Sequence, residues 1–195
     1  MKEVIFFSNN KNKIFEIQNM FSSLEIKLLS LNEFEKVESP NETGKTFEEN
    51  AKIKASYGYN IFNKPCFADD SGICIEAMNG NPGVKSKKFL EINNGLTDAF
   101  KKIALEIKRA NNDKAIFKTS ICLVINKKEH LLFNGEIEGK ISKKIKGVKG
   151  FGYDPIFIPK NYNDTFAEMP LTKKNSISHR QIAIKKLRKY LLSLE

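Results

Sequence analysis

The sequence predicts a protein of the α/β class, and three observations support this prediction. First, a short apolar run, Val4-Ile5-Phe6-Phe7, is followed by turn-favouring residues and then by a helical pattern. Such a continuous apolar run is typical of a buried strand. Second, a capped helical pattern that begins near Thr46 precedes another apolar run at Cys66. Third, a strand pattern at residues 115–125 follows an amphipathic helix. Strands that alternate with helices indicate an α/β sheet.

The size and composition are those of a globular chain with a core of its own. The 195 residues fit one domain, 1–195, and 41% of them are hydrophobic, so the chain is not disordered. No apolar run is long enough to span a bilayer, and the start of the chain does not resemble a signal peptide. Cys66, Cys74 and Cys122 lack metal-ligand spacing and are expected to be reduced thiols of a cytoplasmic protein.

The formal net charge of +10 suggests a polyanionic partner. A nucleotide, a nucleic acid and a membrane surface are all compatible with that charge. A general bias of the composition toward lysine explains it equally well. The charge alone therefore does not choose among these alternatives.

The N-terminal segment predicts a strand, a short polar loop and a helix. Ser8-Asn9-Asn10 end the first apolar run and favour a turn and a helix N-cap, and helical spacing begins at Ile14. Free N–H groups at this helix start would bind an anion, and Lys11 and Lys13 would add positive charge. A solvated helix face is the alternative. A half-buried strand is expected next, at residues 26–28.

The triplet Gly44-Lys45-Thr46 resembles the end of a P-loop, but the rest of that motif is absent. Ser39 stands where the motif has its first glycine, and an acidic loop precedes the triplet instead of a strand. The better interpretation is a helix that begins at Thr46, with Glu49 completing a capping box. Glu42 would then lie on the loop before this helix, where it could reach a metal ion.

The segment from Cys66 to Ile75 carries two adjacent acids, Asp69 and Asp70, between two apolar runs. A turn at Asp69-Asp70-Ser71-Gly72 would join two strands and place the acids at a strand end, where α/β proteins present their chemistry. Adjacent carboxylates are costly without a positive partner, and Mg²⁺ is the simplest one. Because neighbouring side chains of an extended backbone point to opposite faces, the two acids are not expected to share one role. A turn without function is the alternative.

The middle of the chain predicts a loop, a helix and a group of strands. Residues 80–88 contain Gly, Pro, three lysines and Ser86, which indicates a loop that either contacts an anion or is merely solvated. An amphipathic helix is expected around residues 100–107. We expect strands at residues 115–125, 130–133 and 136–141.

Two motifs near the C-terminus combine flexible backbone with recognition groups. In Gly150-Phe151-Gly152-Tyr153-Asp154-Pro155-Ile156-Phe157, an aromatic flanked by glycines can lie against a flat ring, and Asp154 can accept a hydrogen bond from a base. A bulged strand with core aromatics is the alternative. Ser178 is predicted to cap the last helix, so that His179 and Arg180 lie in its first turn, where an anion or a polarised carbonyl would bind.

Taken together, these motifs form an ordered pattern that covers nearly the whole chain. Its blocks are Ser8–Lys13, Glu42-Thr43-Gly44 with Thr46-Phe47 and Glu49-Asn50-Ala51, Ala68–Gly72, Pro82-Gly83, Gly150–Phe157, Thr165–Met169 and Ser178-His179-Arg180. The pattern resembles the inosine/xanthosine triphosphate pyrophosphatases, enzymes that clear non-canonical purine nucleotides. The Gly150–Phe157 block and the Ser178-His179-Arg180 block are, in combination, highly specific to that family.

This resemblance implies Mg²⁺-dependent hydrolysis of ITP, dITP and XTP to the monophosphate and pyrophosphate. It implies an elongated two-lobed α/β fold with a central mixed β-sheet flanked by helices, and an active site in the cleft between the lobes. It also implies a homodimer. We expect a purine nucleoside triphosphate as the substrate, and neither a membrane nor a stable nucleic-acid complex as a partner.

The resemblance also implies roles for individual residues. Asp70 would be the catalytic proton acceptor and, with Glu42, would hold the metal ion. His179 and Arg180 would donate hydrogen bonds to the 6-keto group of the base and so reject the 6-amino group of ATP. The implied substrate-binding residues are Ser8, Asn9, Asn10, Lys11, Asn12, Lys13, Ser71, Phe151, Gly152, Tyr153, Asp154, Lys174, His179 and Arg180.

The sequence departs from the usual pattern of that family at Asn9, where the family has a glycine, and at Lys88, where it has an arginine. Lysine lacks the planar fork of arginine, so Lys88 is not expected to make a bidentate phosphate contact. Two other functions stay open from the sequence. They are a related pyrophosphatase for other modified nucleotides and a basic nucleic-acid-binding protein, which would bind oligonucleotides with a steep salt dependence.

Overall fold

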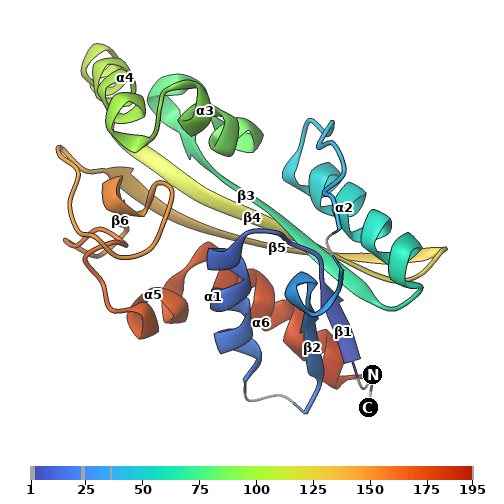
Figure 1. Ribbon diagram of the computed structural model, residues 1–195. Helices are drawn as coiled ribbons and strands as arrows, with labels where there is room; N and C mark the ends of the chain where they lie inside the picture. Colours follow the sequence, from blue (N-terminus) through green and yellow to red (C-terminus); the bar gives the residue numbers. More distant parts are fainter. Residues whose placement is uncertain (1–2, 23–24, 36, 195) are drawn as a thin grey trace. The chain divides into compact units, whose positions relative to one another are not determined.

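The computed structural model describes residues 3–22, 25–35 and 37–194. In this part of the chain the strands form one mixed six-stranded sheet in the order β2-β1-β3-β4-β5-β6, so the predicted α/β class is confirmed (Figure 1). Within the same residues, no helix is both long and apolar enough to cross a bilayer. The strands are β1 Glu3–Phe6, β2 Lys27–Ser30, β3 Cys66–Ile75, β4 Lys114–Asn126, β5 Glu129–Ile141 and β6 Phe157–Pro159. The helices are α1 Lys11–Phe21, α2 Phe47–Phe62, α3 Ser86–Ile92, α4 Leu96–Ala110, α5 Leu171–Ile177 and α6 His179–Leu192.

The chain divides into two compact units. Unit 1 comprises Met1–Asp70, Thr119–Gly135 and Arg180–Glu195, and unit 2 comprises Ser71–Lys118 and Glu136–His179. Strands β3, β4 and β5 therefore contribute one part to each unit. The expected single domain of two lobes, with a cleft between them, stays a prediction.

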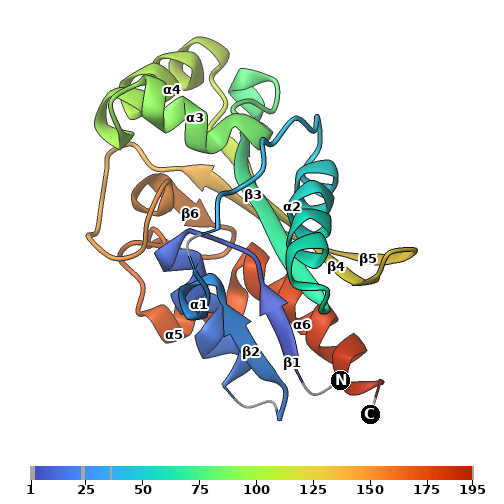
Figure 2. The same cartoon turned by 45° about the vertical axis from the view of Figure 1, so that its right-hand side comes forward.

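The local signals of unit 1 form the expected elements. Strands β1 and β2 lie side by side, as Figure 2 shows. They run parallel, with Val4 opposite Leu28. Helix α1 starts after Asn10, whose side chain accepts hydrogen bonds from the backbone N–H groups of two first-turn residues. Helix α2 begins after Thr46, and the capping box of Thr46 and Glu49 is formed as predicted.

Unit 1 has one hydrophobic core on each face of its sheet, and alternation along β3 connects it to both. Phe67 belongs to the core that α1 and α6 cover, whereas Cys66 and Ala68 belong to the core that α2 covers. Side chains alternate between the faces of a strand. The next two residues therefore follow the same alternation, so that Asp69 faces α1 and α6 and Asp70 faces α2.

Unit 2 has a separate aromatic core. The Phe117 and Phe157 rings make an edge contact with centroids 4.6 Å apart, and Phe166 packs against both rings. Helix α4 contributes the fully buried Ile103 to this core. Strands β5 and β6 pair antiparallel, so the loop that precedes β6 is anchored to the sheet.

The predicted turn at Asp69-Asp70-Ser71-Gly72 is wrong, because β3 runs without interruption from Cys66 to Ile75. The two acids are buried and make ion pairs with basic side chains. A paired carboxylate does not need water, so the chain has no reason to leave the sheet at this point.

Two further predictions of the middle segment are corrected. Residues 80–88 are not a loop throughout, because α3 begins at Ser86, whose buried hydroxyl accepts the Ile73 N–H at 2.9 Å. The strands expected at 130–133 and 136–141 are one strand, β5. Asn134-Gly135 has the composition of a turn, but contacts of Asn134 with α2 and α6 hold it in the sheet. The short helix α5 was not predicted.

Candidate active site

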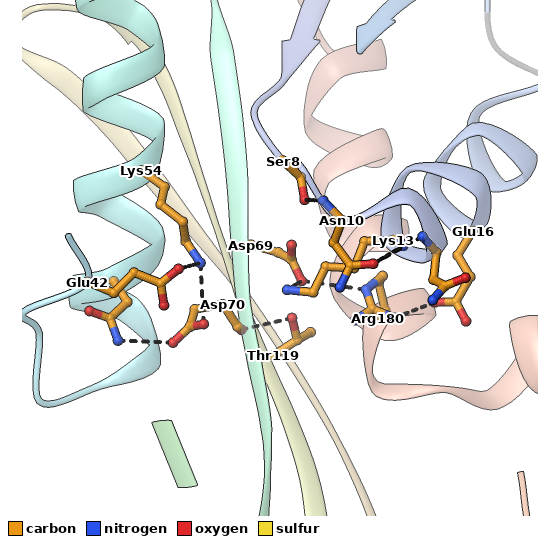
Figure 3. A network of polar contacts seen from close by, with 12 residues as sticks. Ser8, Asn10, Lys13, Glu16, Glu42, Lys54, Asp69, Asp70, Thr119 and Arg180 are labelled. Atoms are coloured by element: carbon orange, nitrogen blue, oxygen red, sulfur yellow. Dashed lines mark hydrogen bonds and ion pairs between the residues drawn. The ribbon is translucent and has the colours of Figure 1, made fainter. Parts of the chain in front are cut away.

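The two adjacent acids of β3 lie in separate environments within unit 1. Figure 3 shows Asp69 on the side of α1 and α6, near Lys13 and Arg180, and Asp70 on the side of α2, near Lys54 and Glu42. The two carboxylates point to opposite faces of β3, which is consistent with the prediction that they have different roles. The strand places them back to back, and the helices on each face decide their partners.

Asp69 belongs to a buried chain of charges. Its carboxylate lies 2.9 Å from the Lys13 ammonium and 3.5 Å from Nε of Arg180. Arg180 Nη1 in turn donates to the buried carboxylate of Glu16. Burial raises the pKa of Asp69, but the charges of Lys13, Arg180 and Lys54 outweigh it and hold that pKa well below its usual range. At neutral pH Asp69 is therefore an anion that pairs with two cations.

Asp70 has a different set of partners. Its Oδ1 lies 3.3 Å from the Lys54 ammonium, and Asn50 Nδ2 donates to its Oδ2 at 3.1 Å. The Thr119 hydroxyl donates to its main-chain carbonyl at 3.1 Å, which ties β3 to β4 at this residue. Burial raises the pKa of Asp70, and the nearby Lys54 only partly opposes this. Neighbouring acids whose pKa values shift in opposite directions are typical of active sites, where one group exchanges protons and the other stays charged.

Lys54 links the second acid to the loop before α2. Its ammonium lies 3.0 Å from Glu42 Oε1 as well as 3.3 Å from Asp70 Oδ1. Burial lowers the pKa of Lys54, but Asp70, Asp69 and Glu42 outweigh it and raise that pKa above its ordinary value. The ammonium is therefore a positive charge at which two carboxylates from distant segments converge.

The loop between β1 and α1 lies on the surface of unit 1. Asn9 Nδ2 donates to Val37 O and to the Ser39 hydroxyl, and the Ser8 hydroxyl accepts the Asn10 N–H. Asn10, Lys11 and Asn12 are exposed, and Lys13 is turned inward to Asp69. The Asn10 side chain occupies the Asn12 and Lys13 N–H groups, at 3.0 and 3.2 Å.

The candidate base-binding residues gather in unit 2. Asp154 Oδ2 accepts the Phe151 N–H at 2.8 Å and pairs with the Lys174 ammonium at 2.5 Å. That ammonium lies 5.0 Å from the centroid of the Phe151 ring, a cation–π distance. The Tyr153 hydroxyl donates to Ser86 O at 2.9 Å. Asp154 thus orients both the aromatic residue and the lysine.

His179 also lies in unit 2, at the start of α6. Its imidazole is buried and stacks on the Phe117 ring, with centroids 4.7 Å apart and planes 6° apart. Ser178 precedes it in an extended conformation, so the predicted start of the last helix is confirmed. Ser71 and Gly152 are half-buried in the same unit.

Gly150 is required by the contact that orients Phe151. Its φ is +73°, and a Cβ there would lie 2.1 Å from Asp154 Oδ2. We expect Gly150→Ala to lower the free energy of unfolding by about 1–3 kcal/mol, because it combines a strained backbone with this clash. Gly80→Ala is the control in urea unfolding, since Gly80 has φ +79° and open space around it. A loss at Gly150 no larger than that at Gly80 would contradict the role of the Asp154 contact.

The structure thus brings the predicted residues together as two groups, each inside one unit. Unit 1 holds Lys13, Glu42, Asp70 and Arg180, and unit 2 holds Ser71, Phe151–Asp154, Lys174 and His179.

Sequence reasoning gave no role to the buried partners of these residues, which are Glu16, Asn50 and Lys54. A signal was present, because Asn50 and Lys54 are polar residues four apart on the buried stripe of α2 that contains Ala51 and Ala55.

Comparisons with known proteins agree with one another. The family model described as Ham1 family matches residues 4–190. A protein of Flavobacterium psychrophilum named dITP/XTP pyrophosphatase is 45% identical over 185 residues, which are 95% of this chain and 96% of that protein. A protein of Oceanobacillus iheyensis with the same name is 40% identical over 194 residues, 98% of each chain.

Solved structures give the same result. A HAM1 protein from Coxiella burnetii is 36% identical and superimposes with a TM-score of 0.86 over 99% of this chain and all of that chain. The Ham1 protein from Staphylococcus aureus is 31% identical, with a TM-score of 0.85 over the whole of both chains.

Proposed function

Because this chain belongs to the Ham1 family, we propose that it hydrolyses the non-canonical purine nucleoside triphosphates ITP, dITP and XTP to the monophosphate and pyrophosphate. It is a nucleoside triphosphate pyrophosphohydrolase, and its activity removes such nucleotides from the pool. The relatives that carry the name dITP/XTP pyrophosphatase support the substrate class.

The observation that carries the proposal is that Asp69 and Asp70 lie in different charge environments. A water that attacks phosphorus must lose a proton to a nearby base. Asp70 suits this role, since burial holds its pKa above the ordinary value and its carboxylate faces Glu42 and Lys54. Asp69 does not suit it, because its ion pairs lower its pKa and so make it a weak base.

Two carboxylates are the proposed ligands of a Mg²⁺ ion. Among the described residues, no three His, Cys, Asp or Glu side chains form a cluster that could hold a metal. Glu42 and Asp70 nevertheless converge on one cation, the Lys54 ammonium. Mg²⁺ is commonly bound through one or two carboxylates together with substrate phosphates, so this donor set fits. When bound, the ion would supply positive charge to the triphosphate.

Basic and polar residues are proposed to bind the triphosphate. The exposed loop from Ser8 to Asn12 precedes α1, and Lys13 lies at its inner end. Lys13 and Lys174 would neutralise the leaving pyrophosphate through charge-assisted hydrogen bonds to its phosphate oxygens. Asp69 and Asp154 support this proposal because each holds at least one of these cations in position.

The base is proposed to lie against Phe151 and to be read by hydrogen-bond donors. Phe151, Gly152, Tyr153 and Asp154 form the turn that would hold it. Donors on His179 and Arg180 would pair with a 6-keto group, whereas the 6-amino group of ATP would leave two donors facing each other. A mismatch of buried polar groups discriminates strongly.

His179→Ala is expected to reduce the preference for ITP over ATP. We expect the ratio of the two kcat/KM values to fall by at least about tenfold, which corresponds to about 1.4 kcal/mol. The ratio compares two substrates on one protein preparation, so a loss of folded protein cancels. His130→Ala, at the other histidine and on the exposed hairpin end of β5, is the control. An unchanged ratio in His179→Ala would refute its assignment to base reading.

Pyrophosphate release from ITP, dITP, XTP, ATP and GTP tests the proposed function directly. Release from the first three alone supports it. Equal release from all five would keep the chemistry and refute the base-reading residues. No release from any of them would refute the function and favour anion binding, and an oligonucleotide titration against salt would then test the nucleic-acid alternative.

We also propose that the protein acts as a cytoplasmic homodimer, as the family resemblance implies. Light scattering on the purified protein tests the assembly, since a dimer has twice the 22.2 kDa mass of the chain. A monomer mass at micromolar concentration would contradict it.

A further inference from the structure

Asn50 is a buried polar side chain to which neither the sequence nor the proposed mechanism gives a role. It lies on the inner face of α2 and is 2% exposed. Both ends of its amide are hydrogen-bonded. Its Nδ2 donates to Asp70 Oδ2 at 3.1 Å, and its Oδ1 accepts the backbone N–H of Gly44 at 2.8 Å.

These two bonds determine how the amide is oriented. The Gly44 N–H can only donate, so it must face the amide oxygen. The amide NH₂ group therefore faces Asp70. Because a carboxylate only accepts, this NH₂ group holds Asp70 Oδ2 on the side of α2 and leaves the other oxygen, Oδ1, directed at Lys54.

The same side chain also holds the segment that carries Glu42. Gly44 lies two residues after Glu42, and a Cβ at Gly44 would lie 2.7 Å from Asn50 Oδ1 and 2.6 Å from the Glu49 Cβ. Only a glycine allows the backbone to approach so closely. Asn50 is therefore bonded on one side to Asp70 and on the other to the segment of Glu42, and both carboxylates contact the Lys54 ammonium.

We propose that Asn50 is a positioning residue that acts through Asp70 and the Glu42–Gly44 segment. It orients the Asp70 carboxylate so that Oδ1 faces the Lys54 ammonium, which Glu42 also contacts, and it sets the distance between the two acids. The expected effect of Asn50 on the rate of hydrolysis rests on the proposed function. Its hydrogen bond to the Gly44 N–H does not depend on that function. Mutation of a group that orients a metal ligand typically costs about 10- to 100-fold in metal affinity or activity.

Three variants separate this role from ordinary core packing. Asn50→Leu removes both hydrogen bonds at similar volume. Asn50→Asp keeps an acceptor for the Gly44 N–H but replaces the donor toward Asp70 by a carboxylate oxygen. Asn93→Leu is the matched control, because Asn93 is a similarly buried asparagine (4% exposed) that lies in unit 2. Its side-chain Nδ2 donates to the backbone carbonyl of Phe89 in α3.

Steady-state kinetics with ITP and Mg²⁺ give the first measurement. We expect kcat to fall about 10- to 100-fold in Asn50→Leu and Asn50→Asp, as for other groups that orient carboxylate ligands. KM for ITP should stay within about threefold, because the side-chain bonds of Asn50 within the described residues go to Asp70 and Gly44 and not to the proposed substrate-binding residues. Asn93→Leu should keep the wild-type kcat.

Hydrogen exchange at the Gly44 amide gives a second measurement that does not depend on activity. The amide should be protected in the wild type and in Asn50→Asp and should exchange faster in Asn50→Leu. Gly44→Ala disturbs the same contact from the loop. If both changes act through one contact, the double variant Gly44→Ala/Asn50→Leu should be no slower in turnover than the slower single variant.

The outcomes separate the two proposals. The positioning role is overturned if both Asn50 variants keep the wild-type kcat, or if kcat falls only in proportion to the loss of folded protein. It is also overturned if Gly44 exchange does not change in Asn50→Leu. If the wild type releases no pyrophosphate, the proposed function fails, and the exchange pattern still decides whether Asn50 holds the Glu42–Gly44 segment.

Discussion

Replacing Asp70 with asparagine is expected to lower kcat for ITP by about 100- to 10,000-fold, the usual contribution of a positioned proton acceptor. The variant keeps the shape of the side chain and removes its charge and its ability to accept a proton. It also removes one of the two carboxylates that converge at Lys54. Pyrophosphate release under saturating ITP and Mg²⁺ measures the effect.

The same variant should fold normally. Burial raises the pKa of Asp70 in the folded protein above its unfolded value. The protonated side chain therefore contributes stability at low pH, and this stability is lost as the pH rises through the folded pKa and the carboxyl ionises. A neutral asparagine avoids this cost, its carbonyl can accept from Asn50, and Lys54 keeps Glu42. In metal-free buffer at pH 7, we expect the free energy of unfolding to stay within about 1 kcal/mol of the wild type.

Asp164→Asn, at an exposed position of unit 2, is the control for the chemical change. It should leave both turnover and stability unchanged. A folded Asp70→Asn protein that retains more than about a tenth of wild-type kcat would show that Asp70 is not the proton acceptor.

Replacing the neighbouring Asp69 with asparagine is expected to have its main effect on stability. The change leaves the largely buried Lys13 ammonium without its carboxylate and removes one partner of Arg180. Removal of one member of a buried ion pair costs about 3–5 kcal/mol. Urea unfolding at pH 7 measures this loss. Asp98→Asn is the control, because Asp98 pairs with Lys101 at 2.7 Å on the exposed surface, where such pairs are worth less than about 1 kcal/mol.

The stabilisation from Asp69 should depend on pH with a definite sign. Lys13 and Arg180 hold its folded pKa below the ordinary value of 3.8, so the stabilisation is present above about pH 4 and is lost as the pH falls further. The difference in unfolding free energy between wild type and Asp69→Asn should therefore narrow below about pH 4. A constant difference down to pH 3 would refute the ion-pair explanation.

Several features of the fold could be predicted because their causes are local. The first strand and helix follow from an apolar run and an Asn10 cap, and α2 follows from a Thr46 cap with Glu49 three residues later. The errors arose where local signals were real but distant contacts overrode them. Asn134-Gly135 resembles a turn, yet bonds to Glu48 and from Lys186 keep it within β5.

The candidate site likewise combines features with local causes and features that distant contacts decide. The sequence by itself determined the kind of chemistry, since the family resemblance of the motif blocks implied nucleotide hydrolysis, and strand alternation separated Asp69 from Asp70. Only the tertiary structure decided which acid is paired with Lys13 and Arg180 and which lies beside Lys54 and Glu42. The physical reason is that a pKa depends on the charges and burial around a group, and these come from helices far away in the chain. Glu16 and Arg180, for example, are 164 residues apart and form a buried ion pair.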